Sequence, residues 1–232
     1  MLEPGLDISQ IMNVSKMAED VGEDWVQEKF INLPTDSNAR LVDFFFMSSR
    51  MICIFEDFQV QEIDIESREV IKLYNLQEIE GFEISEDVEE DKVMAFALEK
   101  DVMLVSVACM TQVHVFEYTE EEEQSLAHVA TIPNPDITEI VFVDYILVMV
   151  QDLKDHIKIM CWDPDTENTA GSIEVEGGGS TKALIQAGSE CIYFTAGSQV
   201  GKIKVPEMSL LFKVDSGHKK PVVDFAVSRL YD

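Results

Sequence analysis

Short runs in which apolar and polar residues alternate, separated by turn residues or charge clusters, follow one another along most of this chain. Alternation with a period of two predicts half-buried β-strands, and strands at such regular spacing indicate a β-sandwich or a β-propeller. The runs form four groups of four. The predicted strands are Ala39–Met47, Met51–Phe55, Val60–Ile65 and Val70–Leu76; Lys92–Leu98, Val102–Cys109, Gln112–Tyr118 and Leu126–Ile132; Ile137–Val143, Tyr145–Val150, Ile157–Trp162 and Gly171–Val175; and Thr181–Ala187, Cys191–Ala196, Val200–Val205 and Leu210–Val214.

The groups repeat one another. The third strand of the third group ends in the pair Trp162-Asp163, and the equivalent positions in the other groups are Ile63-Asp64, Phe116-Glu117 and Val205-Pro206. Consecutive positions lie 53, 46 and 43 residues apart. A repeat of about 40–45 residues is typical of propeller blades with four strands. An acidic insertion at residues 78–91 accounts for the longer first step.

A second mark of this repeat is Gly217-His218, which precedes an apolar run containing Asp224. A Trp-Asp pair ending a strand and a Gly-His opening a blade resemble the WD-repeat family over most of residues 24–232. Only one group has Trp-Asp, and only the last opening has Gly-His. The resemblance implies an all-β, WD-like β-propeller of about four four-stranded blades with incomplete terminal strands; a sandwich of hairpins is the structural alternative. It also implies structural blade roles for Trp162, Asp163, Gly217, His218 and Asp224, with the buried hydrogen-bond network of His218 expected to be incomplete.

The domain organisation follows from the same pattern. Residues 1–23 are predicted to form a mobile acidic N-terminal arm, and residues 24–232 a partial WD-like β-propeller. Trp25–Leu33 is interpreted as an outer strand and Pro221–Ser228 as an inner strand, without the two middle strands that would join them. Open sheet edges attract other strands, so we expect self-association or a partner that completes the ring.

The charge of the chain is strongly one-sided: 45 acidic residues against 17 basic ones give a formal net charge of −28. Direct binding to nucleic-acid phosphates needs a positive surface, so no nucleic-acid partner is expected. A basic protein partner would be attracted. Two acidic runs between strands are candidate docking loops for it, with solvated loops as the simpler interpretation: Glu86, Asp87, Glu89, Glu90 and Asp91, and Glu120, Glu121, Glu122 and Glu123.

Candidate chemistry is sparse. The spacing of the histidines matches neither a metal site nor a Ser-His-Asp triad, and Gly177–Thr181 lacks the Lys of a phosphate-binding loop. We therefore predict no catalytic residue, cofactor or metal.

Three features of the sequence bear on its cellular location. The four cysteines form no Cys-x-x-Cys pair, no run of eighteen apolar residues occurs, and the acidic start lacks a signal-peptide pattern. These features predict a protein of the cytoplasm or nucleus with no membrane partner.

The function that fits these observations is a non-enzymatic WD-repeat-like scaffold or adaptor that mediates protein–protein interactions. Two alternatives stay open. The segment from Gly217 to Ser228 resembles a blade opening in the non-catalytic WD subunit of the tRNA guanine-N7 methyltransferase, with a departure at Lys219-Lys220-Pro221. The acidic composition also fits a chaperone for basic proteins such as histones or ribosomal proteins.

Overall fold

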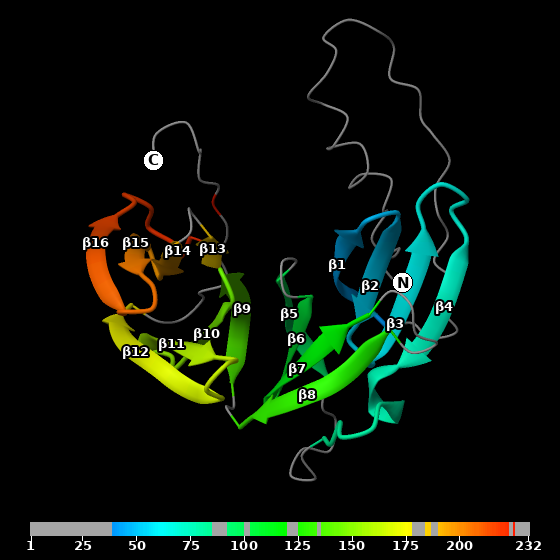
Figure 1. Ribbon diagram of the computed structural model, residues 1–232. Helices are drawn as coiled ribbons and strands as arrows, with labels where there is room; N and C mark the ends of the chain where they lie inside the picture. Colours follow the sequence, from blue (N-terminus) through cyan, green and yellow to red (C-terminus); the bar gives the residue numbers. More distant parts are fainter. Residues whose placement is uncertain are drawn as a thin grey trace, which may run out of the picture. The chain divides into compact units, whose positions relative to one another are not determined.

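The computed structural model describes residues 39–84, 92–99, 103–119, 125–133, 136–177, 184–186, 190–222 and 225. The regular elements of this part are sixteen β-strands and one turn of 3₁₀-helix, η2. The strands form four antiparallel sheets, each of four consecutive strands (Figure 1). The predicted all-β class and the predicted grouping of the strands are therefore confirmed.

The contacts divide the chain into two compact units, Met1–Tyr74 and Asn75–Asp232. The first unit contains one sheet, in the order β1-β2-β3-β4. Its two central strands are buried almost throughout, whereas Ile71 and Leu73 of its last strand are exposed. The strands are β1 (Leu41–Met47), β2 (Arg50–Phe55), β3 (Gln59–Asp64) and β4 (Val70–Asn75).

The second unit begins with η2 (Leu76–Glu78) and contains the other three sheets. The first strand of the middle sheet contacts the first strands of both neighbouring sheets, so the three opening strands lie together. The sheets are β5 (Val93–Glu99), β6 (Leu104–Cys109), β7 (Val113–Tyr118) and β8 (Leu126–Ile132); β9 (Ile137–Val143), β10 (Ile146–Asp152), β11 (His156–Asp163) and β12 (Asn168–Glu176); and β13 (Leu184–Gln186), β14 (Cys191–Ala196), β15 (Gln199–Lys204) and β16 (Ser209–Asp215).

All sixteen predicted strands are present, and among the described residues their ends differ from the prediction by three residues at most, as at Asn168 against the predicted Gly171. One local prediction was wrong: Leu76 belongs to η2 and not to the preceding strand. The side chain of Asn75 accepts a hydrogen bond from the N–H of Gln77, which caps the 3₁₀ turn and ends the strand. The predicted arm at residues 1–23, Trp25–Leu33 and most of Pro221–Ser228 lie outside the described residues.

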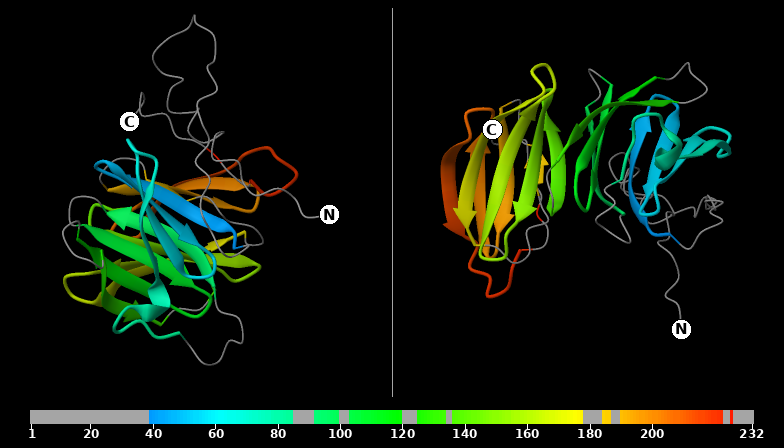
Figure 2. Two further views of the ribbon diagram at one scale, coloured as in Figure 1. Left: turned by 90° about the vertical axis from the view of Figure 1, so that its right-hand side faces the viewer. Right: turned by 90° about the horizontal axis from the view of Figure 1, so that it is seen from below.

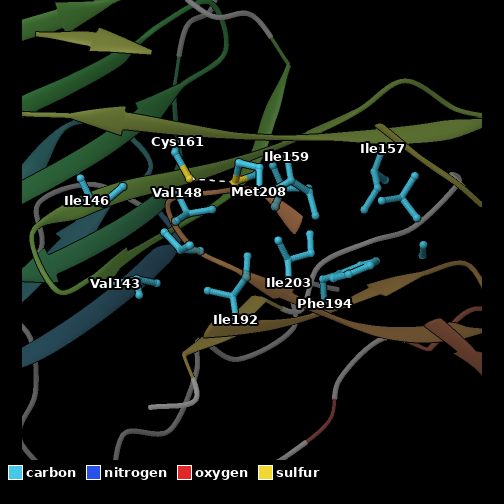
Figure 3. Packing of buried hydrophobic residues seen from close by; sticks show 14 residues of the cluster. Val143, Ile146, Val148, Ile157, Ile159, Cys161, Ile192, Phe194, Ile203 and Met208 are labelled. Carbon is cyan, nitrogen blue, oxygen red and sulfur yellow. Dashed lines mark hydrogen bonds between the residues drawn. The ribbon is translucent and has the colours of Figure 1, made fainter. Parts of the chain in front are cut away.

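The middle sheet is buried on both faces. Along β10, Val148 and Val150 point toward the sheet β13–β16, whereas Leu147 and Met149 point toward the sheet β5–β8. Successive side chains of a strand point to opposite faces, so a strand packed on both sides reads as an uninterrupted apolar run. Figure 2 shows the sheets β9–β12 and β13–β16 packed face to face, and Figure 3 shows the core between them, where the Sγ of Cys161 lies 3.0 Å from the Sδ of Met208.

A shared irregularity supports the repeat. The outer strands β8, β12 and β16 each contain one extra residue opposite the neighbouring strand, at Val129, Ala170 and Leu211 respectively. These three positions are 41 residues apart in each step, within the range of a four-stranded blade repeat. A bulge of this kind bends an outer strand and increases its twist. The three sheets therefore share one local geometry as well as one strand order.

Candidate docking surface

Trp162 lies where the repeat predicts a core residue. Its side chain is 4% exposed and belongs to the core between the sheets β5–β8 and β9–β12. The residues aligned with it from the sequence, Ile63, Phe116 and Val205, are buried as well. The four aligned positions are thus all buried.

Asp163, the second residue of the motif, shapes the turn after β11. Its carboxylate accepts hydrogen bonds from the N–H of Asp165 at 2.9 Å and from the hydroxyl of Thr166 at 3.1 Å. Asp64 does the same after β3, where it accepts from the N–H of Ser67 at 2.6 Å. An aspartate that binds backbone N–H groups ahead of it stabilises a tight turn. Both residues of the motif thus make local contacts, packing for Trp162 and turn hydrogen bonds for Asp163.

The Gly-His pair lies in an exposed turn after β16. Gly217 has a φ of 77°, a conformation that glycine adopts readily, and its N–H donates to Asp215 at 2.8 Å. The N–H of His218 donates to the hydroxyl of Ser216 at 3.3 Å, and the residue is exposed. The incomplete hydrogen-bond network expected for His218 stays a prediction. Asp224 lies outside the described residues.

Neither acidic run can be placed. Glu86, Asp87, Glu89, Glu90 and Asp91 lie outside the described residues, and so do Glu120, Glu121, Glu122 and Glu123. Their predicted role in docking stays a prediction. The glycine run is described only at Gly177, whose N–H donates to the backbone oxygen of Asp155 at 3.0 Å.

A groove of about 520 Å³ opens at one end of the second unit, where sequence analysis predicted no site. Two sheets line it. It is bordered by the start of β5, the turn between β6 and β7, the start of β9, and the end of β10 with the turn that follows. Its lining residues are Met94, Met110, Asp136, Ile137, Thr138, Asp152 and Lys154.

The walls of the groove combine flexible apolar side chains with two carboxylates and one cation, Lys154. Met94 and Met110 are 39% and 37% exposed. Asp136 is held in a left-handed conformation, with a φ of 60°, and its N–H donates to the backbone oxygen of Met110 at 3.0 Å. Asp152 accepts a hydrogen bond from the N–H of Lys154 at 2.9 Å. Methionine adapts its shape to a partner, and carboxylates attract a basic group, so the groove suits a side chain with an apolar stem and a positive head.

A cluster of two histidines is the other feature that the sequence did not reveal. His114 on β7 is fully buried, and its Nδ1 lies 3.2 Å from the Nε2 of His128 on β8. The hydroxyl of Thr131 lies within 3.4 Å of both nitrogens. The two histidines are fourteen residues apart, and the bulge at Val129 helps to bring them together. The sequence predicted the two strands that carry these histidines. It did not predict the bulge, and the pairing of the histidines depends on the register that the bulge sets.

Chemistry of other kinds finds little support among the described residues. They include no group of three or more His, Cys, Asp or Glu side chains placed to hold a metal ion. In the same part of the chain, no helix is long and apolar enough to cross a membrane.

The comparisons with known proteins identify a fold and no family. No family model matches the sequence, and no curated protein matches it. By contrast, 1046 chains of solved structures match, so the fold is too common to indicate one function. One of them belongs to the crystal structure of the mitotic checkpoint complex and is 11% identical, with a TM-score of 0.61.

That match covers 82% of this chain and 55% of the other, so this chain spans about half the length of the chain it resembles. At this identity the likeness concerns the fold alone. Together with the four consecutive four-stranded antiparallel sheets, it establishes that this chain has a WD-like β-propeller fold.

Proposed function

We propose that this chain is a non-enzymatic scaffold of the WD-repeat type that binds a protein partner through the groove between the sheets β5–β8 and β9–β12. The observation that carries the proposal is the combination of Met94 and Met110 with Asp136 and Asp152 in one groove. The preferred partner presents a Lys or Arg side chain next to an apolar one.

The charge of the whole chain supports a basic partner. With a net charge of −28, the protein attracts a positive segment from a distance and repels an acidic one. The attraction between exposed charges is screened beyond about 8 Å at physiological salt, so close contacts in the groove must supply the specificity. Histones and ribosomal proteins belong to this chemical class of partner. The resemblance to the methyltransferase subunit stays a prediction, because Asp224 lies outside the described residues.

Peptide binding tests the proposal. Fluorescence anisotropy compares a labelled peptide with the central sequence Leu-Arg-Leu with one that carries Leu-Glu-Leu. The double variant Asp136→Asn and Asp152→Asn removes both charges and keeps the hydrogen-bond acceptors. We expect binding of the arginine peptide to weaken about 3- to 10-fold, since an exposed ion pair contributes roughly 0.2–1 kcal/mol.

Asp144→Asn is the matched control. Asp144 is an exposed carboxylate in the turn between β9 and β10, outside the groove lining, and it also has a positive φ, of 53°. Its neutralisation should leave affinity nearly unchanged. Equal binding of the two peptides, or an equal loss in the control variant, would contradict the assignment of the groove.

An intracellular location, in the cytoplasm or nucleus, forms part of the proposal. None of the four cysteines is in a disulfide, and Cys53, Cys109 and Cys161 are buried. Buried thiols are typical of proteins from reducing compartments.

Self-association through an open sheet edge remains a separate prediction. The bulges at Val129, Ala170 and Leu211 act against it, since such irregularities discourage strand addition.

A further inference from the structure

The segment that follows β4 forms a strap across the hairpin β7–β8. We use this name for residues 76–84. Leu76, Ile79 and Phe82 are buried, and the ring of Phe82 lies 4.2 Å from the ring of His114 and 6.0 Å from that of Phe116. The strap begins two residues after Tyr74, where the first compact unit ends. It is therefore the part of the chain that leads from one unit into the core of the other.

Hydrogen bonds tie the strap to the two histidines in a continuous chain. The amide nitrogen of Gln112 contacts both the backbone oxygen of Glu83 in the strap and the Nε2 of His114, the latter at 3.1 Å. The Nδ1 of His114 lies 3.2 Å from the Nε2 of His128, which the hydroxyl of Thr131 approaches to 3.1 Å. One polar network thus links the backbone of the strap to the outer strand.

The direction of each hydrogen bond follows from its neighbours. The amide nitrogen of Gln112 can only donate, so the Nε2 of His114 accepts and the ring proton of His114 sits on Nδ1. That proton is donated to the Nε2 of His128, so His128 also carries its proton on Nδ1. All the hydrogen bonds of this network form together only when the rings of His114 and His128 are both neutral.

The strap fits closely over this pair. Gly81 has a φ of 86°, and a side-chain carbon there would lie 3.1 Å from the Nδ1 of His128. Only glycine combines this backbone conformation with so close an approach.

We propose that the strap is a pH-sensitive latch, closed over neutral His114 and His128 and released when the pair takes up one proton. A proton on the Nε2 of His128 faces the Nδ1–H of His114, which places two donors against each other. His114 can relieve this only by moving its own proton to Nε2, where it meets the amide nitrogen of Gln112. Gln112 must then turn its oxygen toward His114, and its hydrogen bond to Glu83 is lost.

The strap and the strands β6, β7 and β8 carry no Lys or Arg that would oppose this response. The strap carries Glu78, Glu80 and Glu83, and β7 carries Glu117; all four are exposed, whereas Tyr118, also on β7, is buried. β6 carries only the buried thiol of Cys109, and β8 carries no ionisable group besides His128.

The pKa values set the pH range of the latch. Burial, followed by the charge of His128, lowers the pKa of His114 to about 4, and burial also lowers that of His128 below 6.5, partly offset by a hydrogen bond to the Ala130 backbone. The neutral pair is complete above pH 6.5 and is lost as the pH falls toward 4.

Amide hydrogen exchange, measured on the whole chain and corrected for the intrinsic exchange rates, reports how often the strap opens. Between pH 7 and 4.5 we expect protection of residues 79–84 to fall at least tenfold, while β10 and β11 keep theirs. Gln112→Leu should weaken the strap already at pH 7 and remove most of its pH response. His156→Gln changes a half-exposed histidine outside the network and should behave like the unmodified protein.

Nitrogen-15 NMR of the imidazoles provides a readout that needs no variant. At pH 7 both rings should show the proton on Nδ1, and the shifts of both should change in the pH range in which the strap opens. Uniform loss of protection along the chain, an unchanged strap, or Nε2–H tautomers at pH 7 would each overturn the latch.

Discussion

The ring of Phe194 packs against Gly201, its partner across β14 and β15. Phe194 is 1% exposed and belongs to the core between the sheets β9–β12 and β13–β16. A side-chain carbon at position 201 would overlap with the ring atoms. A glycine within a strand usually marks such a close approach, and here it makes room for the aromatic ring.

Gly201→Ala should therefore destabilise the fold by about 1–3 kcal/mol, the range for overpacking a filled core. Chemical denaturation measures the change in free energy of unfolding. In a Phe194→Leu background the same substitution should cost less, because the smaller side chain can move aside, and a double-mutant cycle isolates this coupling. If the changes in unfolding free energy of the two substitutions were strictly additive, the ring of Phe194 would not be the reason that position 201 requires glycine.

Trp162→Ala should cost roughly 3–5 kcal/mol, as expected for truncating a large aromatic side chain in a core. Tyr145→Ala is the matched control, because Tyr145 is 46% exposed in the turn before the neighbouring strand β10. The control should change the stability by less than about 0.5 kcal/mol. A loss below about 1 kcal/mol for Trp162→Ala would place that side chain outside the core.

Stability should decrease as the pH falls from about 6.5 to 4. His114 has a folded-state pKa of about 4 against a reference value of 6.5, so the unfolded chain binds more protons in this window. The contribution of neutral His114 is complete above pH 6.5 and lost on acidification. It amounts to on the order of 3 kcal/mol.

Comparing thermal unfolding of the parent protein with that of His114→Phe across this range isolates the effect from the carboxylates. The variant, which cannot be protonated at this position, should lose much less stability than the parent between pH 6.5 and 4. Parallel pH profiles for the two proteins would contradict the prediction.

Arg50 and Glu62 form an ion pair in the first unit, with 3.2 Å between Nη1 and Oε2. The side chain of Glu62 is fully buried and that of Arg50 is 24% exposed. Arg50→Met should cost about 3–5 kcal/mol, because it leaves a buried carboxylate without its cation. The double variant Arg50→Met and Glu62→Leu should recover much of this loss. Equal stability of the single and double variants would show that the unpaired carboxylate of Glu62 is not the source of the loss.

Much of this fold was determined by local sequence. Alternation of apolar and polar residues predicted the strands, including Tyr145–Val150, and the structure shows this strand to be buried on both faces. The repeat position of Trp162 predicted its burial, and Asp163 predicted a turn. These features depend on a residue and its near neighbours, because a strand's side chains alternate and a turn is closed by its own hydrogen bonds.

The tertiary structure alone decided which side chains meet. His114 and His128 became partners through the register of a hairpin with a bulge, and Met94 and Asp152 line one groove because two sheets pack together. Neither relationship produces a periodic pattern in the sequence. Strand register and sheet packing are set by many contacts at once, and a shift of one residue would turn His128 to the opposite face of its sheet.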